Sequence, residues 1–124
     1  MASLLIDTDI LADCLRGRGA ALSFVEGLDD APALSVLTVA ELFAGIREGA
    51  ERGALETMLA SCELIEVDEA IAREGGLLRR RYRPSHGVGI VDAMIAATAL
   101  THGLRLATLN RKHFPMLPDL VVPY

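Results

Sequence analysis

The sequence predicts an α/β fold in which a parallel sheet of four or five strands lies between two layers of helices. Short aliphatic segments alternate along the chain with segments of helical periodicity, as they do in parallel α/β proteins. The first aliphatic segment, residues 4–6, contains no polar residue, which is typical of a strand covered on both faces. The 124 residues, 52% of them hydrophobic, suffice for one core. We therefore expect a three-layer α/β/α sandwich and a single domain spanning residues 1–124.

The individual elements follow from the spacing of apolar residues and from the residues that end each segment. Strands are expected at short aliphatic runs, namely residues 4–6, 33–36, 62–67, 104–107 and a last short one at 121–122. Helices are expected where apolar residues recur three or four positions apart, namely residues 8–16, 20–28, 38–47, 51–61, 69–82 and 93–102.

The helix after Asp68 is the longest of these. Asp68 is expected to cap it, and Ile71, Leu77 and Leu78 are expected on its buried side. Residues 84–89 are expected to form a loop, because they contain one proline and two glycines. The helix is therefore predicted to end near residue 82.

Composition and charge indicate a cytoplasmic protein. The two cysteines, Cys14 and Cys62, form no metal-binding pattern and are expected to be reduced. The first residues lack the pattern of a signal peptide, and charged residues interrupt the apolar stretch 88–109, so no membrane partner is expected. The net charge of −5 argues against a nucleic-acid partner unless several acids are metal ligands.

Three acidic residues each stand at the start of a helix, beside apolar residues. Asp7 could be an N-cap, Glu41 could complete a capping box with Thr38, and Asp92 could cap the helix at 93–102. Each explanation suffices for one residue alone. Together the three acids are expected to point into one crevice, at the carboxyl ends of the strands where parallel sheets bind ligands.

Such a cluster of carboxylates is costly unless it is protonated or binds a metal ion. Ligands that are all oxygen atoms favour hard cations, which makes Mg²⁺ or Mn²⁺ the expected metal. A hard cation in a cleft lowers the pKa of a bound water and stabilises charge on phosphoryl oxygens. The pattern therefore indicates chemistry on phosphate esters.

Four segments, in this order, resemble the PIN-domain family, specifically the VapC-type toxins of bacterial type II toxin–antitoxin pairs. The resemblance covers essentially the whole chain, and the ordered set is far more specific than any single motif. The segments are Ile6-Asp7-Thr8, Leu37-Thr38-Val39-Ala40-Glu41-Leu42 with Gly45, Asp92-Ala93-Met94-Ile95-Ala96-Ala97-Thr98-Ala99, and Leu106-Ala107-Thr108-Leu109-Asn110-Arg111-Lys112-His113-Phe114.

The resemblance implies a PIN-like fold and an Mg²⁺- or Mn²⁺-dependent endoribonuclease that hydrolyses RNA with a metal-activated water. It implies that Asp7, Glu41 and Asp92 bind the metal and act in catalysis, with Thr8 and Thr108 in support. Members are usually dimeric, and each is inhibited by a VapB-like antitoxin whose basic tail enters the active-site groove. Apolar residues near Leu15, Leu42 and Ile46 are expected to supply the rest of that interface.

The sequence departs from the family at the fourth catalytic position. Many relatives carry an acid near the end of the fourth strand, where this chain has Asn110. The change removes a negative charge from the metal site and leaves open whether one or two metal ions bind. Asp9 is not a family ligand, and we interpret it as a structural acid in the first helical turn.

Basic residues gather between positions 73 and 83. For Arg73 a solvated helix face is the favoured explanation. His86 and His113 are interpreted as ordinary loop residues. Contacts with RNA phosphates are expected from Arg80, Arg81, Arg83, Arg111 and Lys112.

Two other functions fit parts of the sequence. Residues 7–11, Asp-Thr-Asp-Ile-Leu, resemble the DxDx(T/V/I)L motif of haloacid-dehalogenase-like phosphatases, with Asp7 as nucleophile and Asp9 as acid. That family needs a downstream catalytic lysine, and Lys112, the only lysine, lies close to the end of the chain. The other alternative is a non-catalytic module that binds a partner through its acidic pocket.

Overall fold

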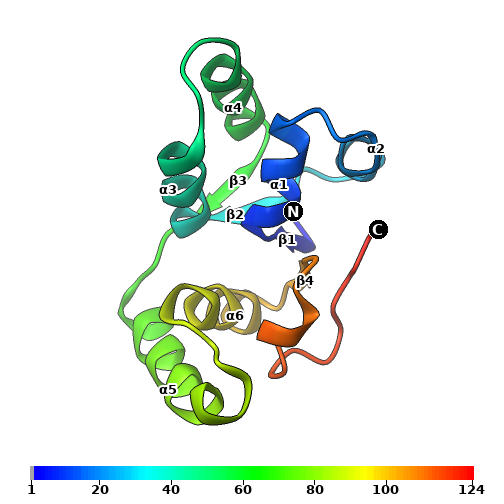
Figure 1. Cartoon of the computed structure of the whole chain (residues 1–124). Coiled ribbons are helices and arrows are strands. Elements are labelled where there is room, and N and C mark those ends of the chain that lie inside the picture. The colour runs from blue at the N-terminus through cyan, green and yellow to red at the C-terminus, as the bar shows by residue number, and fades with distance from the viewer. Residues whose placement is uncertain (1) are drawn as a thin grey trace.

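A computed structural model describes residues 2–124 and has the predicted three-layer α/β architecture (Figure 1). Its central sheet contains four parallel strands in the order β3-β2-β1-β4. The strands are β1 (Leu4–Ile6), β2 (Ala33–Ser35), β3 (Glu63–Ile65) and β4 (Arg105–Ala107). The expected last strand at residues 121–122 is reduced to one parallel bridge between Val121 and Ala107, so the sheet has four strands.

The alternation of side chains along each strand produces two cores, one on each face of the sheet. Leu5 pairs with Leu106 in register, and both contribute to the core beneath α5 and α6. Their neighbours Ile6 and Ala107 also pair, and they contribute to the core on the opposite face. Because successive side chains of a strand point to opposite faces, a three-residue strand without polar residues is covered on both sides.

Within residues 2–124, six helices form the two outer layers. Figure 1 shows α1–α4 on one side of the sheet, and α5 and α6 on the other. The helices are α1 (Thr8–Leu15), α2 (Gly19–Glu26), α3 (Val36–Gly45), α4 (Ala50–Ala60), α5 (Glu69–His86) and α6 (Ile90–His102). A short 3₁₀ turn, η1 (Arg111–His113), follows β4 and was not predicted.

Helices α5 and α6 pack closely because a glycine lies at their contact. A Cβ atom at Gly75 would lie 2.5 Å from Met94 Cγ and 3.0 Å from Met94 Cα, so any larger residue would push the helices apart. Ile71 and Leu78 are buried on the same side of α5, as expected. The prediction for Leu77 is wrong: its side chain is 57% exposed, because it lies on the outer face of the helix.

The boundary between α5 and α6 differs from the prediction. Helix α5 continues through Pro84 to His86, and α6 begins at Ile90 instead of residue 93. Pro84 lies in the last turn, where a missing N–H removes only one hydrogen bond. Gly87, at φ 66°, ends the helix and donates its N–H to the Arg83 carbonyl at 2.9 Å. The expected six-residue loop is therefore only three residues long, Gly87 to Gly89.

None of the helices within residues 2–124 is long and apolar enough to cross a membrane.

Candidate active site

The candidate site lies where the connections of the sheet change direction. From β1 the chain proceeds through β2 to β3, and then crosses to β4 on the other side of β1. In open parallel sheets, ligands bind at such a point, beyond the carboxyl ends of the two adjacent strands whose connections lead in opposite directions. Here those ends carry Asp7 after β1 and Thr108 after β4, and the Asp7 N–H donates to the Ala107 carbonyl at 2.9 Å.

Asp7 is the central and most buried acid of the site, with only 6% of its surface exposed. It is the N-cap of α1, as predicted. Its Oδ1 accepts the Thr8 N–H at 2.8 Å, and its Oδ2 accepts the Thr108 hydroxyl at 2.8 Å. Burial and the negative charge of Asp9 nevertheless raise the pKa of Asp7 to about 7. The negative charge of Asp92 makes a smaller contribution to the same rise in pKa.

Asp9 has a structural role in the fold, in agreement with its interpretation from the sequence. Its Oδ1 accepts the Ile10 N–H at 2.8 Å, and its Oδ2 accepts the Leu109 N–H at 3.1 Å. The second bond ties the start of α1 to the segment after β4. Both oxygens are engaged by backbone groups, which disagrees with the acid role that a phosphatase would require of Asp9.

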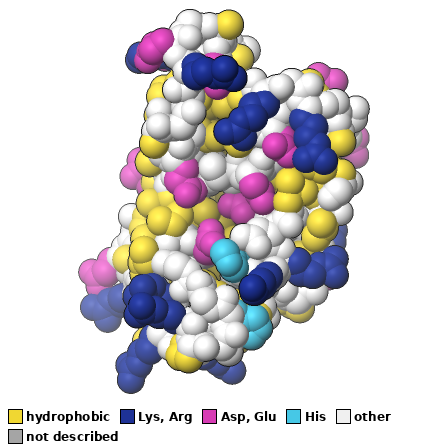
Figure 2. Space-filling view, in the orientation of Figure 1, with side chains coloured by type: hydrophobic (Ala, Val, Ile, Leu, Met, Phe, Trp, Pro, Cys, Tyr) yellow, Lys and Arg dark blue, Asp and Glu magenta, His cyan; other side chains and the backbone are white. Residues whose placement is uncertain are grey.

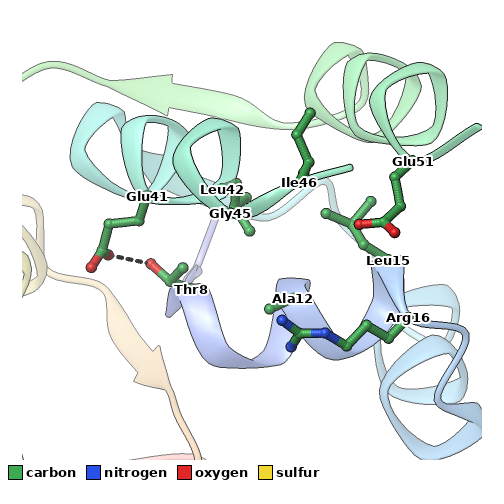
Figure 3. Close-up of a pocket in the computed structure, with 9 residues that line it drawn as sticks. All are labelled: Thr8, Ala12, Leu15, Arg16, Glu41, Leu42, Gly45, Ile46 and Glu51. Atoms are coloured by element: carbon green, nitrogen blue, oxygen red, sulfur yellow. Dashed lines mark hydrogen bonds between the residues drawn. The ribbon is translucent and has the colours of Figure 1, made fainter. Parts of the chain in front are cut away.

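Glu41 reaches the site from α3, on one side of Asp7. The predicted capping box is wrong, because α3 begins at Val36 and its N-cap is Ser35, whose Oγ accepts the Leu37 N–H. Glu41 Oε1 instead accepts the Thr8 hydroxyl at 2.6 Å (Figure 3).

A second hydroxyl supports this contact. Thr38 Oγ1 lies 3.1 Å from Thr8 Oγ1. Because the one hydroxyl proton of Thr8 goes to the carboxylate of Glu41, the fully buried Thr38 must be the donor to Thr8. Thr38 therefore holds the Thr8 hydroxyl, and the Thr8 hydroxyl in turn orients the exposed carboxylate of Glu41.

Asp92 reaches the site from α6, on the other side of Asp7. It is not the N-cap of that helix, since α6 begins at Ile90 after the cap Gly89. Its Oδ2 lies 3.0 Å from Nδ1 of His113, and the side-chain nitrogen of Asn110 lies 2.8 Å from the same Nδ1. His113, interpreted from the sequence as a loop residue and not a ligand, lies in the 3₁₀ turn η1 and contacts an acid of the site. The available signal was its spacing of three residues from Asn110, which is one turn of η1.

The donors at the site suit a hard cation, although they are not gathered around one point. Within residues 2–124 no three His, Cys, Asp or Glu side chains lie close enough together to hold a metal ion. Glu41 is turned toward Thr8, and Asp92 toward His113. The candidate donors are nevertheless carboxylate oxygens, and Asp7 is a buried acid whose ionisation a cation would favour.

Basic side chains surround this acidic centre. Figure 2 shows acidic side chains in the middle of one face, a histidine beside them and basic side chains toward the rim. The five basic residues expected to contact RNA are all exposed. Arg80, Arg81 and Arg83 lie in the second half of α5, which a three-residue loop joins to the start of α6, near Asp92. Arg111 and Lys112 lie in η1, beside His113.

A groove of about 380 Å³ extends from the site between α1 and α3. Thr8 and Glu41 lie at one end of it, and Arg16 and Glu51 at the other (Figure 3). Leu15, Leu42 and Ile46, the residues expected in a partner interface, also line the groove. The apolar groove is thus continuous with the acidic centre.

Fold and site together define the class of protein. Residues 4–118 match the PIN domain family, and the chain belongs to that family.

Among its relatives are two proteins of Mycobacterium tuberculosis. Ribonuclease VapC19 is 48% identical, over 97% of this chain and 98% of that protein. Ribonuclease VapC10 is 45% identical, over 98% of this chain and 92% of that protein. A solved toxin–antitoxin complex from Klebsiella pneumoniae contains a chain of the same fold, with a TM-score of 0.85, 32% identity and 98% coverage of both chains.

Proposed function

We propose that this protein is a metal-dependent endoribonuclease and the toxin of a toxin–antitoxin pair. The observation that carries the proposal is the buried Asp7 at the point where the sheet connections part, with Glu41 on one side and Asp92 on the other. Relatives at 48% and 45% identity are named ribonucleases, which supports the choice of RNA as the substrate.

In this proposal Asp7, Glu41 and Asp92 hold Mg²⁺ or Mn²⁺. The bound cation would lower the pKa of a coordinated water and offset charge on the attacked phosphate. Thr108 and the Thr8 N–H keep the Asp7 carboxylate fixed at the strand end. Thr8 Oγ1 and His113 each hold one of the flanking acids. Asn110 belongs to the His113 side of the site and adds no charge to it.

The basic rim is proposed to bind the phosphates of the RNA on either side of the cleaved bond. The RNA would contact Arg80, Arg81 and Arg83 on one side of the cleaved bond. It would contact Arg111 and Lys112 on the other side. Single-stranded or loop RNA is the expected substrate, because its backbone can bend into a groove lined with acids. The net charge of −5 is then compatible with binding RNA, since the acids of the site would hold the cation and basic side chains lie toward the rim of the same face.

The groove between α1 and α3 is proposed to accept the antitoxin. Its apolar residues would bury apolar side chains of the partner, and Glu41 at its end would pair with an arginine or lysine of the antitoxin tail. Such a basic side chain would compete with the metal ion for the same carboxylates. The solved toxin–antitoxin complex with a chain of this fold supports the proposal.

The test is cleavage of single-stranded RNA by the purified protein with Mg²⁺ or Mn²⁺, and with EDTA. We expect cleavage with either metal and none with EDTA. The matched variant is Glu41→Gln, which keeps the side-chain length and removes the charge. It should lower kcat by about 100-fold or more and leave the free energy of unfolding within about 0.5 kcal/mol, since Glu41 is exposed. Undiminished cleavage in EDTA would contradict the proposal.

A further inference from the structure

His113 stands at a fixed place beside the candidate active site. Its backbone N–H donates to the Asn110 carbonyl at 3.1 Å, and the Asn110 N–H donates to Thr108 Oγ1 at 3.0 Å. The next residue, Phe114, is 1% exposed and anchors the turn in the core. The imidazole is therefore carried by a backbone segment with bonds at both ends, and the position of Nδ1 is set by the fold.

The partners of Nδ1 determine where the imidazole carries its proton. A carboxylate only accepts hydrogen bonds, so the 3.0 Å contact with Asp92 Oδ2 requires an N–H at Nδ1. An amide nitrogen could not donate to that same N–H. Asn110, 2.8 Å away, must then turn its amide oxygen toward the ring. His113 Nδ1–H is thus shared between a carboxylate and an amide oxygen.

We propose that His113 is a positioning residue for the metal site, and that it acts through the Nδ1–H bond to Asp92. The bond fixes one oxygen of Asp92 and leaves Oδ1, which accepts no hydrogen bond from the described residues, as the atom for the cation. Thr8 has the same relation to Glu41, one of whose oxygens accepts its hydroxyl. This inference rests on the proposed metal-dependent function. Outer-shell hydrogen bonds of this kind commonly change metal affinity 10- to 100-fold.

Because the hydrogen bond to Asp92 is made by Nδ1 and not by Nε2, two substitutions that each keep one of these nitrogen positions can test the proposal. In His113→Asn, the amide nitrogen occupies the place of Nδ1 and can still donate to Asp92. In His113→Gln, the amide nitrogen lies at the distance of Nε2 and cannot. His86→Ala is the matched control, because the one hydrogen bond of His86 Nδ1 within the described residues is with the neighbouring Ser85 hydroxyl, at 2.7 Å.

The first measurement is calorimetric titration of Mn²⁺ into each folded protein without RNA. We expect affinity within about threefold of wild type for His113→Asn and His86→Ala, and affinity about 10- to 100-fold weaker for His113→Gln and His113→Ala. Equal affinity in all variants would overturn the proposal. So would full affinity in His113→Gln with loss in His113→Asn, because the ring would then act through Nε2.

The second measurement separates this inference from the proposed function. Nitrogen-15 NMR of the metal-free protein should show His113 protonated at Nδ1, and Asp92→Ala should release that preference. A wild-type imidazole protonated only at Nε2 would overturn the inference. If the Nδ1–H bond is present but wild-type protein binds no Mn²⁺, the metal-dependent function fails and the positioning role toward a metal fails with it.

Discussion

The acids of the candidate site are held in two different ways. Asp7 lies at the end of the central strand, and its carboxylate is fixed by the Thr8 N–H and by Thr108 at the end of the adjacent strand. Glu41 and Asp92 lie on opposite helical layers, and within residues 2–124 each forms a hydrogen bond with one side chain, Glu41 with Thr8 and Asp92 with His113. The sheet therefore determines where Asp7 lies, whereas the flanking acids depend on single contacts made across the site.

This difference predicts opposite consequences for stability and activity at Asp7. Asp7→Asn keeps an oxygen for the Thr8 N–H and can still act as an N-cap, but it removes a buried charge next to Asp9 and Asp92. We expect RNA cleavage to be abolished, and the metal-free protein to become more stable by ~1–3 kcal/mol at pH 8. Chemical denaturation with and without Mn²⁺ measures this. A variant less stable than wild type would show that the buried charge does not strain the fold.

The dependence of that stability gain on pH has a definite sign. The pKa of Asp7 is raised from 3.8 to about 7 in the folded state, so between these pH values the folded protein holds a proton that the unfolded chain has lost. The contribution of Asp7 to the free energy of unfolding of the wild-type protein is therefore largest near pH 4. It decreases by up to ~1.4 kcal/mol per pH unit as the pH rises to about 7. The stability of Asp7→Asn relative to wild type should increase over the same window. A constant difference would contradict the raised pKa.

The sequence predicts the parts of the site that local rules control. A run of aliphatic residues that ends in Asp7 predicts a strand and an acid at its end, and the structure agrees. The contacts of the flanking acids follow from long-range packing instead. Thr8 and Glu41 are 33 residues apart, and Asp92 and His113 are 21 apart, so no local pattern records either pair.

The same reasoning explains the errors at helix boundaries. Local capping rules suggested Thr38 and Asp92 as the starts of helices, but Ser35 and Gly89 precede those positions and begin α3 and α6 earlier. Pro84 was expected to break α5, yet it lies in the last turn, where little is lost. Resemblance to a family selects the three acids as candidates, whereas the side chains that orient them follow only from the three-dimensional structure.

Removal of the contact that holds Glu41 is expected to lower kcat less than removal of the Glu41 carboxylate itself. Thr8→Val should release the Glu41 carboxylate and leave the buried Thr38 hydroxyl without its partner. We expect kcat to fall about 10- to 100-fold, with a loss of ~1–3 kcal/mol in stability. Thr8→Ser is the control and should retain most activity, because it keeps the hydroxyl. If Thr8→Val cleaves RNA at the wild-type rate, Glu41 needs no such support and the two flanking acids are not equivalent in this respect.

The smallest effects are expected on the basic rim, whose side chains form no ion pair with an acid within residues 2–124. Arg79, Arg80 and Arg83 line a hollow on α5. Arg73 is the matched control: it lies on the same helix but ten residues before Arg83, about 15 Å along the axis, and it pairs with Glu69.

We expect Arg83→Ala to raise KM for RNA severalfold, leave kcat unchanged and reduce the slope of log KM against log salt by about 1, which is the signature of one lost phosphate contact. Because phosphates carry no sequence information, the effect should be the same for RNAs of different sequence. The measurement is a salt series of cleavage rates for wild type, Arg83→Ala and Arg73→Ala. If Arg73→Ala changes the slope equally, the rim acts through net charge alone. If Arg83→Ala lowers kcat with KM unchanged, the arginine acts on the bond that is cleaved, and the rim is then part of the same machinery as the acids.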